Sequence, residues 1–471
     1  MLAEKLKILS RAENLQIELQ QSREEGKDIR RYEKKAQDIL QLPAEDPRRE
    51  KEATVLFDRL AKAPQVKNYP YVEPSEYTEI VAARPTLDIP QYPLPIDLSN
   101  EAIFDKVYGA WLGRSAGCLL GQPVEGYKYG WTREKITGLL KDTDNYPINY
   151  YISSDIPQEL REKYKLSDKY AKYNNKYTSW INNVKSGVED DDTNFTVLGL
   201  KLLEDNGSQF TPLDVVNTWL TQLPALRTCT AERVAYRNML DGVTPPESAT
   251  FRNPFREWIG AQIRADVFGY VAPGNPELAS KMAWKDASVS HVKNGIYGEM
   301  KAAAMISAAA VTDNVEEIIN AGLSQIPEKS RLTEATKELL VWKKSGKSWE
   351  EVIDTIHERY DESNDHEWCH TVPNSMIVDA ALLYGEGDFE KTIGLTVMSG
   401  LDTDSNGATV GSVSGMILGA RALPEKWTRP LNDSLLTSVG AMGTVKISEL
   451  AERTIKVMQT INDTDQSPKT A

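Results

Sequence analysis

The sequence predicts an all-α protein, a compact bundle of many helices that follows a helical and proline-rich N-terminal arm. From about residue 101 onward, alanine-rich stretches with helical spacing of apolar residues dominate, as in 299–311. Alternating strand-like runs are scarce, and short loops containing proline or glycine separate the helical stretches. With 471 residues, of which 40% are hydrophobic, the chain has ample material for a buried core.

The first 95 residues differ from the rest and predict a separate arm. In 2–41, Leu and Ile recur at mixed spacings, several of them three or four residues, among many charged residues, a pattern typical of an amphipathic helix or helical hairpin. Between Pro43 and Pro95, nine prolines recur at short intervals, which favours an extended connector or a linker. All ten tryptophans lie after this arm, so we expect the aromatic core downstream of it.

The chain is therefore expected to divide into the arm at 1–95, a main helical domain at 96–460 and a flexible tail at 461–471. Within the main domain, the segment 142–186 is rich in Tyr, Asn and Lys and lacks apolar periodicity. This segment predicts a surface insertion.

Composition excludes several classes of function. The formal net charge of −14 argues against a nucleic acid or an anionic membrane as partner. No uncharged apolar run reaches 18 residues, and no signal peptide is visible. The three cysteines, Cys118, Cys229 and Cys369, form no CxxC pair, which fits a reducing compartment. We expect a soluble cytoplasmic protein.

Two runs of glycine at every fourth position predict an unusual pair of helices. The first run is Gly109, Gly113, Gly117 and Gly121, and the second is Gly407, Gly411, Gly415 and Gly419. Residues four apart share one helix face, and each interior glycine costs about 0.8–1 kcal/mol relative to alanine. This cost is explained if another backbone must approach closely, so we expect the two helices to pack together at the centre of the bundle.

Two acidic clusters precede predicted helices, at 189–193 (EDDDT) and 402–406 (DTDSN). Helix capping accounts for one carboxylate in each. The additional carboxylates repel one another and favour a bound cation if the clusters converge. Oxygen ligands without a neighbouring His or Cys suit Mg²⁺, Mn²⁺ or Ca²⁺ better than Zn²⁺. An EF-hand is excluded, because position 12 counted from Asp402 is Val413 instead of glutamate.

Other catalytic constellations are absent from the sequence, which has no GxGxxG after a strand, no GxxxxGK[ST], no HExxH and no GxSxG. His366 and His370 stand four residues apart, but no third ligand lies near them in sequence, so zinc is disfavoured there. We expect His370 to form a hydrogen bond or to pack near a pocket. Cys118, on the first glycine helix, is expected to pack in the core.

Four segments together resemble the signatures of the ADP-ribosylglycohydrolase family, which includes the dinitrogenase reductase activating glycohydrolase. They occur in the family's order within about 101–450, and they are GAWLGRSAGCLLGQPVEG, DDDTNFTVLGL, KDASVSHVKNGIYGEM and SGLDTDSNGATVGSVSGMILG. The resemblance implies an all-α domain of the ADP-ribosylglycohydrolase type. It also implies a centre of two Mg²⁺ ions, or Mn²⁺, that serves to remove ADP-ribose from a modified side chain.

The resemblance also implies roles for individual residues. The expected metal ligands are Asp190, Asp191, Asp192, Asp402, Asp404 and Ser405, and the expected catalytic residues are Glu125, Asp191 and Asp192. The expected substrate contacts are Glu125, Arg264, Asp266, His291, His370, Asn406 and Gly407. The chain departs from the family pattern at Cys118, where aspartate is usual, and at Asp190, where threonine is usual.

The expected reaction is hydrolysis of the glycosidic bond between ADP-ribose and an acceptor, with an arginine-type N-glycoside favoured. The alternatives are hydrolysis of a small ribosylated metabolite or nucleoside, and a non-catalytic scaffold that binds ADP-ribose. The substrate is accordingly an ADP-ribosylated protein or a small ADP-ribosyl compound, and oligomerisation through the arm is conceivable. The acceptor, the number of metal ions and the identity of the general base stay open at this point.

Overall fold

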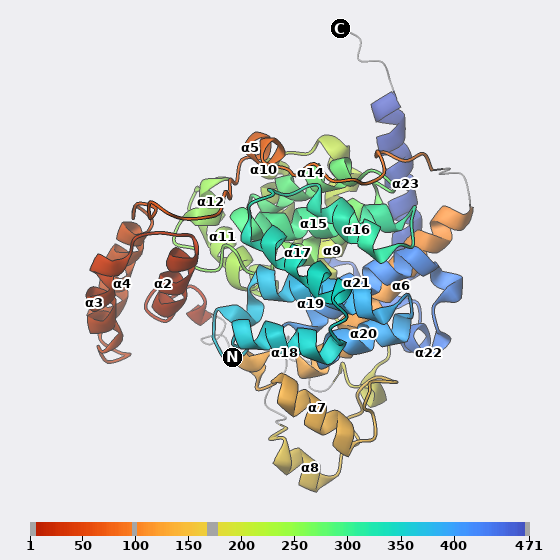
Figure 1. The fold of residues 1–471 in the computed structure, drawn as a ribbon, viewed down its shortest axis with the longest axis horizontal. Coiled ribbons are helices and arrows are strands. Elements are labelled where there is room, and N and C mark those ends of the chain that lie inside the picture. Colours follow the sequence, from red (N-terminus) through yellow and green to blue (C-terminus); the bar gives the residue numbers. More distant parts are fainter. Residues whose placement is uncertain (1–5, 97–100, 167–177, 467–471) are drawn as a thin grey trace.

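The computed structural model describes residues 6–96, 101–166 and 178–466, and helices make up almost all of its regular structure (Figure 1). Among these residues the only sheet is an antiparallel pair of short strands, β1 (Ser434–Thr437) and β2 (Gly443–Lys446), with Leu435 opposite Val445. The predicted all-α class is confirmed. No helix in the described ranges is both long and apolar enough to cross a membrane.

The main body contains eighteen α-helices within its described residues. They are α6 (Glu101–Gly121), α7 (Arg133–Asp142), α8 (Gln158–Lys163), α9 (Asp191–Asn206), α10 (Pro212–Gln222), α11 (Thr230–Leu240), α12 (Glu247–Thr250), α13 (Asp266–Tyr270), α14 (Pro276–Ala287), α15 (Lys293–Ala309), α16 (Val315–Leu323), α17 (Arg331–Lys344), α18 (Trp349–Arg359), α19 (Thr371–Gly385), α20 (Phe389–Met398), α21 (Thr403–Leu418), α22 (Glu425–Thr428) and α23 (Ile447–Gln466). Short 3-10 helices connect them, including η1 (Gln122–Val124), η7 (Gln262–Arg264) and η8 (Glu367–Cys369).

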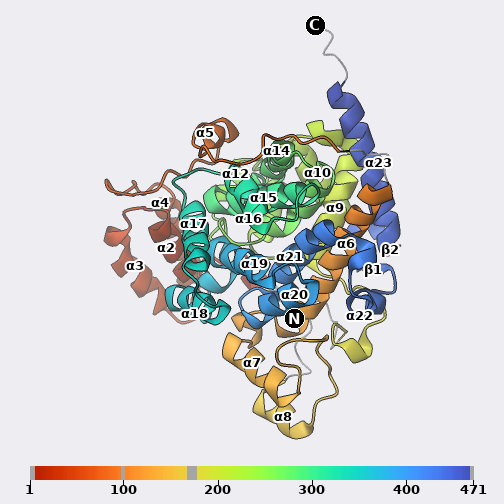
Figure 2. The ribbon, with the colours of Figure 1, turned by 45° about the vertical axis from the view of Figure 1, so that its right-hand side comes forward.

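The two glycine helices, α6 and α21, pack against each other through the middle of the body (Figure 2). A Cβ added at Gly113 would overlap the carbonyl oxygen of Gly411, and one added at Gly117 would overlap that of Gly407. The reverse holds for Gly411, whose Cβ would overlap the carbonyl oxygen of Gly113. Glycine is therefore required by direct backbone contact, and the predicted close packing of these helices is confirmed.

The arm begins with three helices that have an apolar core of their own: α2 (Leu15–Glu24), α3 (Arg30–Leu40) and α4 (Pro47–Leu60). We call residues 6–63 the N-terminal unit. The structure adds α4 to the predicted hairpin, because Pro47 occupies the first helical turn, where proline favours a helix, and Asp46 caps it. Residues 64–96 then run over the main body with one short helix, α5 (Tyr77–Ala82), as the extended connector that the prolines predicted.

The predicted surface insertion needs correction. The predicted surface insertion, described at 142–166 and 178–186, buries several apolar side chains in the main core, among them Tyr151 and Trp180. The hydroxyl of Tyr151 donates to the carbonyl oxygen of Trp427 (2.6 Å), so that aromatic packing fixes this segment without helical periodicity. Helix α23 extends to Gln466, into the segment predicted as a flexible tail, whose end at 467–471 lies outside the described residues.

Candidate active site

The glycine helices determine where the acidic residues meet. The hydroxyl of Thr403, the first residue of α21, donates to the carbonyl oxygen of Gly121, the last residue of α6 (2.9 Å). Gln122, which follows α6, donates to a carboxylate oxygen of Asp190, just before α9 (2.5 Å). The N-terminal ends of α9 and α21 therefore meet at the C-terminal end of α6, and their dipoles favour negative groups there.

Helix capping explains part of this arrangement. Asp190 is the N-cap of α9, and its carboxylate accepts a hydrogen bond from the backbone N–H of Asp192 (3.3 Å). The hydroxyl of Thr193 accepts one from the N–H of Asp190 (3.2 Å), which completes a capping box. One carboxylate satisfies this requirement, so the remaining acidic side chains need another explanation.

Carboxylates from three chain segments form one buried centre. Ligand atoms of 190–192 lie within 4.8 Å of one another, and so do those of Glu125, Asp402 and Asp404. The hydroxyl of Ser405 links the two groups, because it lies 2.8 Å from Oδ1 of Asp402 and 3.4 Å from Oδ2 of Asp192. We call these six carboxylates the acidic centre.

The electrostatics of the acidic centre favour a cation. Asp192 is 2% exposed, and burial together with the nearby carboxylates of Asp190, Asp404 and Asp191 raises its pKa well above the ordinary value. Its Oδ1 atom is buried and accepts no hydrogen bond from the described residues. A divalent cation with oxygen ligands would relieve both conditions, so the residues present fit a metal of the Mg²⁺ or Mn²⁺ type.

A thiol also borders the acidic centre. The sulfur of Cys118 lies within 4.8 Å of ligand atoms of Asp190 and Asp404. Burial, followed by these neighbouring carboxylates, raises the pKa of the thiol well above its usual range. The expectation that Cys118 packs in the core agrees with its 2% exposure.

The acidic centre faces a small cavity of about 60 Å³. Five of the residues expected at the site line this cavity, namely Glu125, Asp191, Asp192, Asp402 and Ser405. Asp190 and Asp404 are fully buried next to them. The structure therefore brings together the predicted catalytic residues and the predicted metal ligands.

The loop that carries Glu125 is held in place by its neighbours. Gly126 has a φ of +52°, and a Cβ there would overlap the ring of Trp368. Its N–H donates to the carbonyl oxygen of Leu401 (3.1 Å), one residue before Asp402. Glycine at this position thus lets the loop turn under the indole ring and brings Glu125 beside the second acidic segment.

Several residues of the cavity wall are not among those predicted from the sequence. Glu232, on α11, is 1% exposed and lines the cavity, and burial raises its pKa to about 7 although Arg264 opposes the shift. Cys369 lines it too, with its thiol 3.4 Å from Oδ2 of Asp402. Ile8, from the N-terminal unit, is a third residue of the cavity wall that was not predicted. A single glutamate or isoleucine in an amphipathic pattern carries no signal of such a position.

Arg264 and Asp266 do not line this cavity. The Arg264 guanidinium is 1% exposed and pairs with Glu232 (3.0 Å), Asp286 and Glu299. Asp266 pairs with the buried Arg114 (2.9 Å). Both residues therefore hold helices together behind the site, as ion pairs in the interior of the body.

Three other expected substrate contacts also lie elsewhere. His291 is 1% exposed and lines a different cavity of about 310 Å³ beside Trp284. Asn406 donates from its side chain to Oδ1 of Asn374 (2.7 Å), which also receives the N–H of Asp402. Gly407 packs against the backbone of Gly117, in the contact between α6 and α21.

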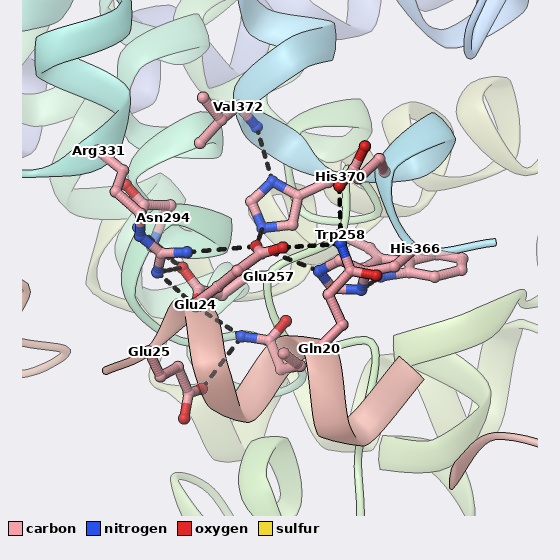
Figure 3. A network of polar contacts seen from close by, with 12 residues as sticks. Gln20, Glu24, Glu25, Glu257, Trp258, Asn294, Arg331, His366, His370 and Val372 are labelled. Atoms are coloured by element: carbon pink, nitrogen blue, oxygen red, sulfur yellow. Dashed lines mark hydrogen bonds and ion pairs between the residues drawn. The ribbon is translucent and has the colours of Figure 1, made fainter. Parts of the chain in front are cut away.

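His370 belongs to a second cluster, formed with His366 and Glu24 (Figure 3). Nε2 of His366 and Nε2 of His370 lie 3.3 Å and 3.5 Å from the same carboxylate oxygen of Glu24. Both Nδ1 atoms accept hydrogen bonds, from the indole N–H of Trp258 (3.0 Å) and from the backbone N–H of Val372 (3.2 Å). Each neutral imidazole therefore carries its proton on Nε2, which leaves no lone pair for a metal.

The fold and the site define an all-α protein with a buried carboxylate centre at the meeting point of three helix ends. The model of the ADP-ribosylglycohydrolase family matches residues 99–464, which is most of the chain, and the protein belongs to that family. Membership indicates a hydrolase that acts on ADP-ribosylated substrates. A solved structure described as an ADP-ribosylglycohydrolase-related protein complex is similar at 19% identity and a TM-score of 0.48, over 77% of this chain and 100% of that chain. Comparison with proteins of curated function found no match.

Proposed function

We propose that the protein is a metal-dependent hydrolase that cleaves the glycosidic bond between ADP-ribose and an acceptor and releases ADP-ribose. The observation that carries this proposal is the convergence of six carboxylates from three chain segments at one small cavity. The family membership supports the same activity.

The residues that would hold the metal are Asp190, Asp191, Asp192, Asp402, Asp404 and Ser405. Two Mg²⁺ ions suit this number of oxygen ligands, and Mn²⁺ has similar ligand preferences. When bound, such ions lower the pKa of water and fix the orientation of ribose hydroxyls.

The chain's own carboxylates would then carry the proton and stabilise charge. Breaking the bond at C1″ of the ribose develops positive charge on the sugar, and the oxygen of water adds to this carbon as the acceptor leaves. Glu125 lines the cavity beside the acidic centre and is our first candidate to take the proton from that water. Asp191 and Asp192 are the alternatives, and such a general base contributes about 10²–10⁴-fold in rate.

Arginine, linked to ADP-ribose as an N-glycoside, is the acceptor that the charge of the cavity favours. Glu125, Asp191 and Glu232 all line it, and a guanidinium leaving group would be attracted to carboxylates. A small ribosylated metabolite is the second candidate, and the cavity volume of about 60 Å³ favours it. The presence of six carboxylates at one cavity disfavours a non-catalytic scaffold, because their mutual repulsion has a clear function only if they bind a metal.

Calorimetric titration with ADP-ribose, in Mg²⁺ and in EDTA, tests the proposal without knowledge of the acceptor. We expect binding in Mg²⁺ that is lost in EDTA and in Asp402→Ala. Binding that persists in EDTA would remove the metal from the mechanism. Absence of binding in both buffers would point to a nucleoside-like substrate or a scaffold.

A further inference from the structure

The N-terminal unit forms part of the wall of the acidic cavity. Ile8 lines the cavity together with Glu125 and Asp191, and both Ile8 and its neighbour Leu9 pack against the apolar core of the main body. The family model begins at residue 99, so this part of the wall comes from outside the family domain.

Buried ion pairs hold the unit in a fixed position. Arg256 of the main body pairs with Glu18 of α2 (2.7 Å) and with Glu25, the residue that follows α2 (2.6 Å), and no side chain of the three is more than 5% exposed. Opening this contact would leave a buried charge without its partner, which is strongly unfavourable. A second pair, Asp58 with Arg252, joins α4 to the body through two 2.8 Å hydrogen bonds. These contacts anchor the unit to the main body beside the cavity.

Helix α2 also supports the side of the cavity formed by Trp368 and Cys369, which belong to η8. Gln20 donates from its side chain to Oε1 of Glu367 (2.8 Å), at the start of η8. Glu24 faces the two imidazoles that flank η8 in sequence (Figure 3). Helix α2 thus supports a further wall of the site, and Ile8 lies in the segment that leads into this helix.

The small volume of the cavity limits which part of a substrate can enter it. Its volume of about 60 Å³ has room for only a few water molecules. Pockets for whole drug-sized ligands measure about 300–1,000 Å³. The cavity can therefore hold the reacting bond of a substrate and the atoms next to that bond. Ile8 is the residue of the N-terminal unit that lines this cavity, and the three helices of the unit lie at one side of the body (Figures 1 and 2).

We propose that the N-terminal unit determines the substrate class: its wall at Ile8 admits a small, free ADP-ribosylated compound and excludes an ADP-ribosylated protein. A protein acceptor would have to bring its surface over the cavity, where the fixed unit stands in the way. A free compound such as ADP-ribosylarginine has no such surface. This inference rests on the proposed hydrolysis of ADP-ribosyl bonds.

The test compares two substrates with the same linkage, free ADP-ribosylarginine and a protein ADP-ribosylated on arginine, in the full-length chain. We expect the wild type to hydrolyse the free compound with at least tenfold higher kcat/KM. Ile8→Ala should reduce this preference at least threefold by admitting the protein substrate. Leu6→Ala is the matched control, because Leu6 is 44% exposed and does not line the cavity. Thermal unfolding of both variants checks that each is folded.

The outcomes separate the substrate class from the activity. A wild type that prefers the modified protein, or a preference that is the same in Ile8→Ala and Leu6→Ala, overturns the proposed role of the wall while leaving the hydrolase intact. Hydrolysis of neither substrate, with metal-dependent binding of ADP-ribose retained, overturns the substrate class. Failure of ADP-ribose binding itself rejects the proposed function, and the inference with it.

Discussion

The acidic centre and the Glu24–His366–His370 cluster both bring three or more potential metal ligands within 4.8 Å, yet they balance their charge in different ways. In the acidic centre, burial and the neighbouring carboxylates raise the pKa of Asp192, and the nearby Arg114 is occupied by Asp266 and by backbone carbonyl groups. In the second cluster a single carboxylate faces two imidazole N–H groups and lies 3.5 Å from the guanidinium of Arg331.

Proximity of ligand-type residues does not by itself make a metal site. A metal needs lone pairs that are not already engaged, and an excess of negative charge favours it. The acidic centre offers both, whereas the second cluster is neutralised by its own hydrogen bonds and ion pairs. The second cluster therefore joins the N-terminal unit to the body.

The largest effect should follow from separating the helices that hold the acidic centre. Gly113→Leu places a side chain where the carbonyl oxygen of Gly411 lies, and we expect it to lower the free energy of unfolding by at least about 3 kcal/mol. Urea denaturation measures the change. Thr460→Leu, at an exposed position of α23, is the control and should be nearly neutral. Unchanged stability of Gly113→Leu would contradict the backbone contact.

Removing one charge from the acidic centre should abolish activity without harming the fold. We expect Asp402→Asn to lower kcat/KM for an ADP-ribosyl substrate by at least about 10²-fold, and Asp205→Asn, on the exposed side of α9, to leave it unchanged. Without metal, the thermal midpoint of Asp402→Asn should equal or exceed that of the wild type, because a repelling carboxylate is gone. A large fall in this midpoint would mean that the carboxylate stabilises the fold.

The two clusters also differ in how far the sequence predicted them. The glycine ladders and the runs 189–193 and 402–406 are local patterns, and repeated spacing or adjacent acids predicted both the packing of two helices and the acidic site. Glu24 lies 342 residues from His366, and no local pattern links them. The ion pairs of Arg264 likewise join residues 22 to 35 positions away, on separate helices. Such contacts depend on tertiary packing, for which periodicity gives no signal.

The second cluster should make stability depend on pH between about 4 and 6.5. Burial lowers the pKa of His370 to about 4, so that in this range the unfolded chain binds a proton that the native state does not. Stability should therefore fall as the pH is lowered from 6.5 to 4, by up to about 3 kcal/mol from this residue. Glu232, whose pKa is raised to about 7, contributes in the opposite direction between 4.5 and 7. Unfolding of the wild type alone would show only the sum of these two opposite contributions.

Subtracting the curve of His370→Asn isolates the contribution of the imidazole. His370 is the N-cap of α19, and its ring accepts a hydrogen bond from the N–H of Val372. Asparagine is also a favoured N-cap residue, so this variant can retain the cap. Urea unfolding at several pH values should give a flatter dependence below pH 6.5 for this variant. Parallel curves would show that His370 titrates in the folded protein as it does in the unfolded chain.

The smallest effect should come from neutralising the carboxylate of the second cluster. We expect Glu24→Gln to lower the free energy of unfolding by about 1–3 kcal/mol, since it weakens charge-assisted contacts with His366 and His370 while Arg331 keeps Glu73 and Glu257. Metal-dependent ADP-ribose binding, measured by calorimetry, should be preserved, in contrast to Asp402→Asn. If Zn²⁺ raised the thermal midpoint of the wild type but not of Glu24→Gln, a metal would bind at the second cluster, and the distinction drawn between the two clusters would be wrong.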